Sequence, residues 1–199
     1  MLARSHVMFG LTAAVVLDGV AHISGPPLAT TTPVPIDLII NKVIFFSMVA
    51  IGAILPDIDN AQSTIGRRFG WISKEIQRIA GHRTIFHSLL GLLLGSLLAI
   101  GLEQLVVFLL AQRGFIFPSR FVAKSHLVFV ALLFGCILHI VADGLTESGV
   151  PLLWPYRKRF GFPPNPQWRF RTGDWQEYVI VYSSMLLVCI GVWQAIIKI

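Results

Sequence analysis

Cysteine and charged residues are both scarce in this chain, and each scarcity excludes a class of protein. The two cysteines, Cys136 and Cys189, lie inside apolar runs and lack the CxxC or Cys/His spacing of a zinc ribbon. A disulfide-dependent fold is therefore excluded, and we interpret both thiols as buried or lipid-facing. Charged residues make up 13% of the chain against about 25% in soluble domains, while hydrophobic residues make up 55%. This composition predicts an integral membrane protein.

Basic residues outnumber acidic ones, but they do not form a nucleic-acid-binding pattern. The net charge is +6, and the basic residues lie in segments between apolar runs. They are not interleaved with aromatic residues as in recognised RNA- or DNA-binding modules. Anionic lipid headgroups are the simpler partner for such charges. We therefore predict contacts with membrane lipids and none with nucleic acid.

Several apolar segments approach the length of about 20 residues that spans a bilayer. They cover residues 6–23, 37–55, 85–111, 126–143 and 177–198. The first is the weakest, because Asp18 and His22 interrupt it, and with Arg4 before it this segment could instead be a signal peptide. There is no internal repeat, and the connecting segments are too short for a second domain. We expect an all-α fold, a polytopic transmembrane helical bundle with about five membrane-embedded helices, as a single domain over residues 1–199.

The connecting segment from Ser63 to Ala80 has an amphipathic pattern. Its apolar residues recur every three or four positions with basic residues between them: Ile65, Phe69, Ile72, Ile76 and Ile79. This spacing predicts one amphipathic interfacial helix lying on the membrane surface. The alternative is a plain solvated connector.

Lys and Arg are unevenly distributed among the connecting segments. Residues 60–84 carry five, residues 144–175 carry five, residues 112–125 carry three and residues 24–36 carry none. The positive-inside rule then places the amino terminus and the two richest segments in the cytoplasm.

In this topology the polar residues at the ends of the apolar segments gather on the cytoplasmic side. They are His6, Asp57, Asp59, His82, His87, His139 and Asp143. Such groups are costly at a membrane unless they are paired or bind a metal, so they form a candidate site. His22 and His126 fall at the opposite side, and we exclude them from it.

Two pairs of residues have spacings that bear on metal binding. His139 and Asp143 are four apart on one helix, which suits two ligands of one ion, although a hydrogen bond that staples the helix end is an equal alternative. His82 and His87 are five apart and would diverge on a continuous helix. We therefore predict Thr84 as the N-cap of a helix that starts at the next residue, with His82 in the loop before it. Two unrelated interfacial histidines are the alternative.

Two carboxylates follow Pro56, which favours an extended exit from the preceding helix. In an extended stretch Asp57 and Asp59 face the same way and can bridge cations, hold a ligand or serve as a base. Ordinary turn chemistry is the alternative. Arg83 offers a fork for a phosphate or carboxylate, or is a lipid-facing anchor. Asp18 and Glu103 we keep as helix-packing or cavity groups.

Three motifs follow one another along the chain and are specific in combination. They are Leu-Pro-Asp-Ile-Asp at 55–59, Gly-His-Arg-Thr-Ile-Phe-His-Ser at 81–88, and His-Ile-Val-Ala-Asp-Gly-Leu-Thr-Glu-Ser-Gly-Val-Pro-Leu-Leu-Trp-Pro at 139–155. Together they resemble the YdjM-type family of bacterial inner-membrane proteins, described as membrane-bound metal-dependent hydrolases. The resemblance runs from His6 to about Phe160, although the stretch after Pro155, running through residues 162–166, departs from the pattern.

The resemblance implies a metal site with zinc as its ion. Its ligands would come from the same set of residues, His6, Asp57, Asp59, His82, His87, His139 and Asp143. The family is also similar, more distantly, to zinc-dependent phospholipase C and the S1/P1 nucleases, helical enzymes that cleave phosphodiesters with a cluster of zinc ions.

We therefore expect a zinc-dependent, phospholipase-like hydrolase that cleaves an ester or phosphoester of a lipid or lipid-like substrate. It would act at the cytoplasmic face of a bacterial inner membrane. One to three Zn²⁺ would lower the pKa of bound water toward about 7. His6 would complete a second ion's shell, Asp59 would orient a ligand or act as base, and Arg83 would neutralise charge on phosphate.

Two rival functions remain. In a divalent-metal or proton-coupled transporter the same residues would line a path, although such sites usually lie near mid-bilayer. In a non-catalytic membrane scaffold they would only staple helices.

Overall fold

The predicted all-α bundle is confirmed. The structure is a computed structural model that describes residues 1–26, 35–81 and 83–197. Long helices account for most of these residues: α1 (Ala3–Ala21), α2 (Ile36–Gly52), α5 (Leu89–Ala111), α6 (Ser119–Gly144) and α7 (Trp175–Ile197). The short helices are η2 (Leu55–Asp59), α3 (Thr64–Phe69), α4 (Trp71–Ala80), η3 (Ile85–His87) and η4 (Pro166–Trp168). Within the described part of the chain, β pairing is limited to two isolated bridges.

Membrane-spanning length is clearest in three of the helical stretches. By length and composition, residues Ile36–Asp59, Leu89–Ala111 and Arg120–Gly144 can each cross a bilayer. The apolar stretch of α7, Trp175–Ile190, is shorter. Helix α1 carries Arg4 and Asp18 within its nineteen residues.

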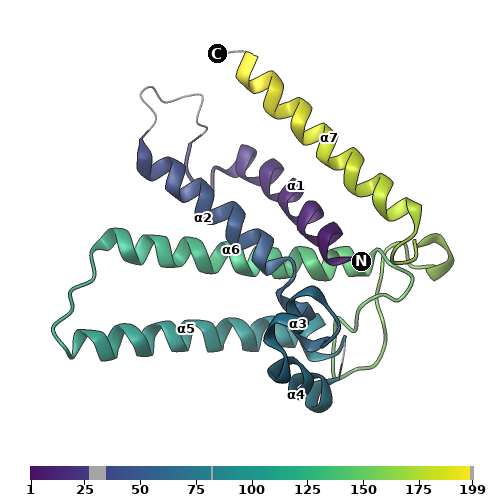
Figure 1. The fold of residues 1–199 in the computed structure, drawn as a ribbon, viewed down its shortest axis with the longest axis horizontal. Coiled ribbons are helices and arrows are strands. Elements are labelled where there is room, and N and C mark those ends of the chain that lie inside the picture. The colour runs from purple at the N-terminus through teal and green to yellow at the C-terminus, as the bar shows by residue number, and fades with distance from the viewer. Residues whose placement is uncertain (27–34, 82, 198–199) are drawn as a thin grey trace.

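The ends of the long helices alternate between the two ends of the molecule. In Figure 1, α1, α5 and α7 begin at the right-hand end, where α2 and α6 finish. The segments that contain α3, α4 and η4 lie at this same end, which we call the loop end. This arrangement agrees with the alternation expected from the sequence. Which end faces the cytoplasm stays a prediction.

Two glycines bring α2 and α6 into backbone contact. A Cβ added at Gly135 would lie 2.4 Å from the carbonyl oxygen of Val49, and one at Gly52 would lie 2.3 Å from that of Leu132. Only glycine permits such an approach, which is a common way for helices to associate in membranes. Around this contact Phe45, Val49 and neighbouring apolar residues form the buried core.

Helix α5 packs differently from the other long helices. None of its residues, all of which the structure describes, is buried. A ladder of hydrogen bonds within the helix satisfies its backbone, so this apolar surface is suited to lipid contact. Its first turn is held by Ser88, whose hydroxyl accepts from the amide of Gly91 at 3.0 Å.

The prediction of one interfacial helix over residues 63–80 was wrong, because the segment forms two. The chain breaks at Gly70, whose φ of +53° is unfavourable for residues with a side chain. Ser73 in α4 donates to the carbonyl oxygen of Ile58 at 2.6 Å and anchors the pair of helices on η2. The apolar side chains of Trp71 and Ile79 stay exposed. The pair thus keeps the amphipathic character of an interfacial element.

The segment between α6 and α7 folds over the loop end without a long helix. Isolated β-bridges hold it together, one between Thr146 and Phe170 and one between Val150 and Phe160. Arg169 is buried there and donates to the carbonyl oxygens of Pro163 and Pro164, each at 2.6 Å.

At the opposite end, a buried carboxylate joins α1 to α2. Asp18 lies 3.0 Å from the Lys42 ammonium and accepts hydrogen bonds from both the amide and the hydroxyl of Ser24. This is the helix-packing role expected for Asp18.

Candidate metal centre

Four side chains from three elements converge at the loop end. His139 and Asp143 come from α6, His87 from η3 and Asp57 from η2. The Nε2 atoms of His87 and His139 are 3.1 Å apart, and each lies 3.7 Å from Oδ1 of Asp57. Oδ2 of Asp143 is 3.7 Å from the first and 3.9 Å from the second. Ligands of a tetrahedral zinc ion lie about 3.3–3.6 Å from one another, so these spacings are close to those of a metal site.

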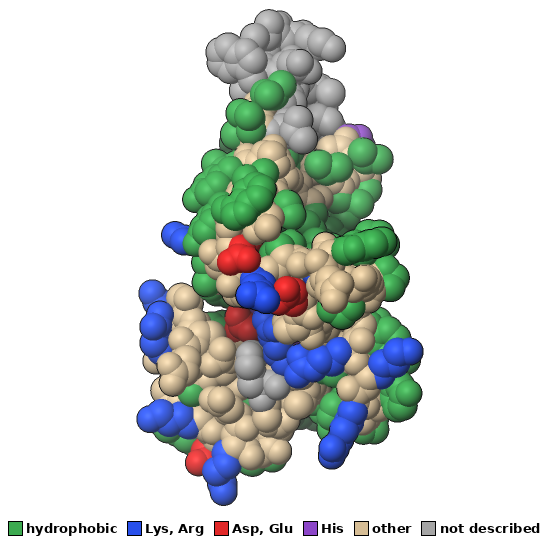
Figure 2. Space-filling model, turned by 90° about the vertical axis from the view of Figure 1, so that its right-hand side faces the viewer, with side chains coloured by type: hydrophobic (Ala, Val, Ile, Leu, Met, Phe, Trp, Pro, Cys, Tyr) green, Lys and Arg blue, Asp and Glu red, His purple; other side chains and the backbone are tan. Residues whose placement is uncertain are grey.

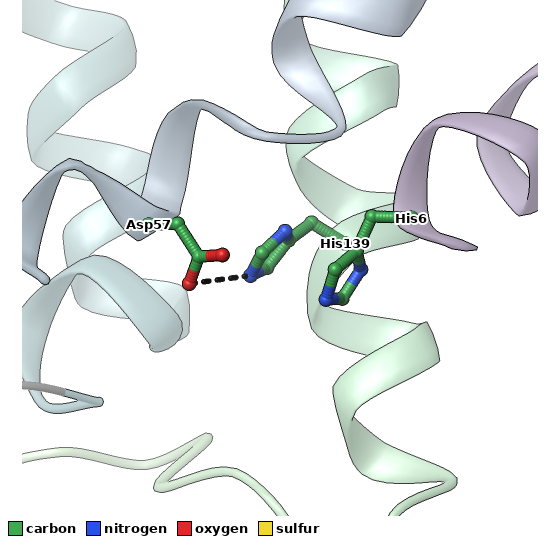
Figure 3. Close-up of side chains that lie close together, drawn as sticks. All are labelled: His6, Asp57 and His139. Atoms are coloured by element: carbon green, nitrogen blue, oxygen red, sulfur yellow. Dashed lines mark ion pairs between the residues drawn. The ribbon is translucent and has the colours of Figure 1, made fainter. Parts of the chain in front are cut away.

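His6 brings a further imidazole to this group. Its ring stacks on that of His139, with ring centres 3.8 Å apart and an interplanar angle of 13°. Figure 3 shows the two rings side by side, with Asp57 directed toward the far side of His139. His6 Nε2 is 3.3 Å from Oδ1 of Asp143. Its position beside Asp57 and His139 makes His6 a candidate ligand of a second ion next to the first.

The two carboxylates of η2 contact His87 on different sides of its ring. Oδ2 of Asp59 lies 3.3 Å from Nδ1, whereas Asp57 approaches Nε2. The prediction of an extended exit after Pro56 was wrong, because residues 55–59 form a 3-10 helix. With three residues per turn, positions two apart diverge instead of facing the same way. Asp57 can therefore serve as a ligand while Asp59 orients His87.

A backbone carbonyl determines the orientation of His139. Its Nδ1 lies 2.7 Å from the carbonyl oxygen of Ala53, and because that oxygen only accepts, Nδ1 carries the hydrogen. Nε2 is then the lone-pair nitrogen and faces the cluster. Ala53 follows Gly52, and Gly135 lies one turn before His139, so the close contact of α2 with α6 creates this hydrogen bond.

Carboxylates around His87 stabilise its protonated form. Burial by itself lowers the pKa of His87, but hydrogen bonds with Asp57 and Asp59, together with the charge of Asp143, outweigh burial and raise it to about 9. A proton on Nε2 and a metal ion on Nε2 would use the same lone pair. Metal binding at this nitrogen therefore requires His87 to lose its proton.

Arg83 lies beside the cluster, as its predicted role near phosphate requires, but its guanidinium is paired. It is 3.0 Å from Oδ2 of Asp143 and donates to the hydroxyl of Ser148. Its backbone amide donates to Oδ2 of Asp59 at 3.1 Å. The amino group of Met1 lies 2.6 Å from Oδ1 of Asp143. Two cationic groups thus face the Asp143 carboxylate.

The predicted position of His87 within its helix needs correction. A 3-10 helix does start at Ile85 with Thr84 at the N-cap position, but the Thr84 side chain does not cap it; its hydroxyl donates to the carbonyl oxygens of Ala80 and Gly81. A 3-10 turn intervenes, and α5 begins at Leu89 with Ser88 as its cap. This turn directs His87 inward, where it is fully buried. His82, predicted as a ligand, lies outside the described residues.

The loop end carries charge around a covered site. Figure 2, which faces this end, shows Lys and Arg side chains across its lower half and acidic side chains beside basic ones near its centre. His6, His87 and His139 are buried beneath other side chains. His22 and His126 are exposed residues outside the cluster, consistent with their exclusion.

One buried acid was missed by the sequence reasoning. Glu177, at the start of α7, accepts from the amides of Leu2 and Gly173, each at 2.8 Å. It thereby joins the beginning of α7 to that of α1. The only signal for it was an acidic residue in the first turn of an apolar helix, where the helix dipole favours it.

Comparisons with known proteins identify a membrane protein family. The family described as YdjM inner membrane protein matches residues 1–198. The chain is 41% identical over 110 residues to the inner membrane protein YdjM of Escherichia coli (strain K12), and equally to that of Shigella flexneri. It is 28% identical over 173 residues to the uncharacterized protein YvsG of Bacillus subtilis (strain 168), covering 87% of this chain and 92% of that protein. No solved structure matches.

The family match covers more of this chain than the alignments with the individual YdjM proteins do. The alignment with the YdjM proteins covers 55% of this chain and spans about half, 48%, of their own length. The family match extends beyond Phe160, where the motifs end, to residue 198. Together with the apolar helices, it indicates a protein of the bacterial inner membrane. The resemblance inferred from the motifs is confirmed, and this chain belongs to the YdjM inner membrane protein family.

Proposed function

We propose that this protein is a metal-dependent hydrolase of the inner membrane that cleaves an ester or phosphoester of a lipid or lipid-like substrate. The observation that carries the proposal is the convergence of His87, His139, Asp57 and Asp143 at ligand-like spacing, with the lone pair of His139 directed inward by Ala53. Imidazole nitrogens and carboxylate oxygens are ligands that zinc accepts.

The donor set fits a metal ion on one further ground. The buried Nδ1 of His6 has no hydrogen-bond partner among the described residues. An unsatisfied buried nitrogen is uncommon, and a ligand role for the His6 ring would account for its burial. His87, His139, Asp143 and Asp57 would hold one ion, and His6 would complete the shell of a second ion beside Asp57.

Zinc would supply hydroxide at neutral pH by lowering the pKa of a bound water. The protein's own residues would do the remaining work. Asp59 would keep the His87 ring oriented through Nδ1, and Ala53 would do the same for His139. Arg83 would exchange its contact with Asp143 for an anionic substrate group, which its charge-assisted donors favour. Two adjacent ion positions favour phosphoryl chemistry over simple ester cleavage.

The cluster would lie on the cytoplasmic side of the membrane. Positive loop charge favours the cytoplasm for the loop end, and the cluster would then face the cytoplasmic headgroups. A transporter is less favoured because the cluster lies at the helix ends, whereas transport sites usually lie near mid-bilayer on broken helices.

Metal analysis of the purified protein tests the site. We expect stoichiometric zinc in the wild type and its loss in a variant with His139→Ala and Asp143→Ala. The matched control is a variant with His22→Ala and His126→Ala, which removes exposed histidines outside the cluster and should keep its zinc. Metal-free wild type would overturn the metal site. A loss of stability in the first variant, without zinc in either protein, would then indicate a scaffold in which these residues staple helices.

Proteoliposomes test the reaction. We expect the wild type to release a headgroup or acyl product from phospholipid, and the double variant to release none. A wild type that binds zinc, cleaves no phospholipid and instead moves zinc across the bilayer would support the transporter and overturn the hydrolase.

A further inference from the structure

An apolar groove lies between α5 and α6. Its volume is about 320 Å³, within the range of small-molecule sites in proteins. Its walls include Leu92, Gly95 and Ala99 on α5 and Phe129, Leu132 and Cys136 on α6. Figure 1 shows these two helices running side by side away from the loop end. The groove therefore follows the direction that a lipid chain takes from the membrane surface toward its interior.

Part of the groove is lined by the sequence neighbours of two cluster residues. Pro56 and Ile58 line it, and they flank Asp57 in η2; Phe86 lines it and precedes His87 in η3. The same two short helices thus present apolar side chains to the groove and polar side chains to the cluster. A ligand that fits both must be apolar at one end and charged at the other.

Small residues on α5 keep the groove open. Gly91 is required for another reason, because a Cβ there would lie 1.8 Å from the carbonyl oxygen of Ile85. Gly95, one turn further along, would place its Cβ more than 4 Å from every neighbouring atom. A larger side chain at this position would instead project into the groove.

We propose that this groove holds one acyl chain of a membrane phospholipid and so positions its phosphate headgroup at the cluster. The inference rests on the proposed function and names its substrate class. Charge supports a phospholipid, since Arg83 lies beside the cluster and Lys and Arg surround the loop end (Figure 2). A chain gains little by leaving a bilayer for an equally apolar groove. The groove therefore determines where the lipid lies relative to the cluster, and the headgroup contributes most of the binding affinity.

Photocrosslinking tests the groove separately from the chemistry. Zinc-loaded full-length protein is placed in vesicles of phosphatidylethanolamine and phosphatidylglycerol, the latter carrying a diazirine on one acyl chain. Adducts are mapped by peptide mass spectrometry. The test variant is Gly95→Leu, which fills the groove, and the matched control is Gly101→Leu. Gly101 is also on α5, and a Cβ there would likewise meet no neighbouring atom, but this residue does not line the groove.

We expect adducts on α5 and α6 in the wild type and in Gly101→Leu, and their loss in Gly95→Leu with zinc content unchanged. Adducts spread evenly over all apolar helices, or equal labelling in both variants, would overturn the inference and leave the hydrolase proposal intact. Replacement of lipid adducts by crosslinks between two α5 helices would also overturn it, because a second copy would then cover the groove. Labelled groove residues in a protein without zinc would support the groove and contradict the hydrolase.

Discussion

Helix α6 contacts α2 and α5 in opposite ways, although both contacts involve glycine. At Gly135 a Cβ would collide with the backbone of α2, whereas at Gly95 on α5 it would meet nothing. The first contact is closed and orients His139 through Ala53. The second leaves a groove lined in part by Pro56, Ile58 and Phe86, the sequence neighbours of Asp57 and His87. One face of α6 therefore supports the cluster, while the other borders an open groove.

Gly135→Ala should give the largest effect, because it breaks the closed contact. The new Cβ would lie 2.4 Å from the carbonyl oxygen of Val49, so α2 must move and Ala53 must leave His139. We expect a loss of about 1–3 kcal/mol in the free energy of unfolding, together with reduced zinc content. Thermal unfolding in detergent and metal analysis measure both. Unchanged zinc with reduced stability would show that the carbonyl is not needed to orient the histidine.

Zinc binding should depend on pH through His87, which lies on the η3 side of the cluster. Its pKa is raised to about 9, so at neutral pH a proton must leave before zinc binds. We expect affinity to rise by up to about tenfold per pH unit as pH increases toward 9, measured by competition with a zinc chelator.

The Asp59→Asn variant provides the control for this pH dependence. It removes a carboxylate that raises the pKa of His87, so the rise in affinity should level off at a lower pH. The metal-free protein should behave in the opposite sense: stability from the protonated histidine is complete below its ordinary pKa of 6.5 and is lost as pH rises through about 9. An affinity that does not change with pH would contradict the geometry at Nε2.

Gly95→Ala should have the smallest effect and the opposite sign to the same substitution at Gly135. Nothing obstructs the new methyl group, and alanine favours a helix over glycine by up to about 1 kcal/mol. We expect a small rise in unfolding temperature with zinc content unchanged. A loss of stability comparable to that of Gly135→Ala would mean that α5 closes on α6, which would remove the groove.

Much of the candidate site could be predicted from particular residues. The spacing of His139 and Asp143, together with the distribution of Lys and Arg, placed the cluster residues at one end of the bundle, and the described ones meet there. The local geometry was predicted less well. The turns that hold Asp57 and His87 are 3-10 helices, and Ser88 instead of Thr84 caps α5. Short turns of this kind depend on contacts with distant residues, such as the hydrogen bond from Ser73 to Ile58.

The order of residues alone is enough to predict a helical membrane protein, because apolar runs of bilayer length can satisfy their backbones only as helices. It also determined that the polar residues share one end, since successive spans must alternate in direction. Helix packing, by contrast, sets which nitrogen of His139 faces the cluster and which face of α6 stays open. Both outcomes depend on the distance from each glycine to the facing helix, which is short at Gly135 and long at Gly95. The spacing of residues along the chain does not contain that distance.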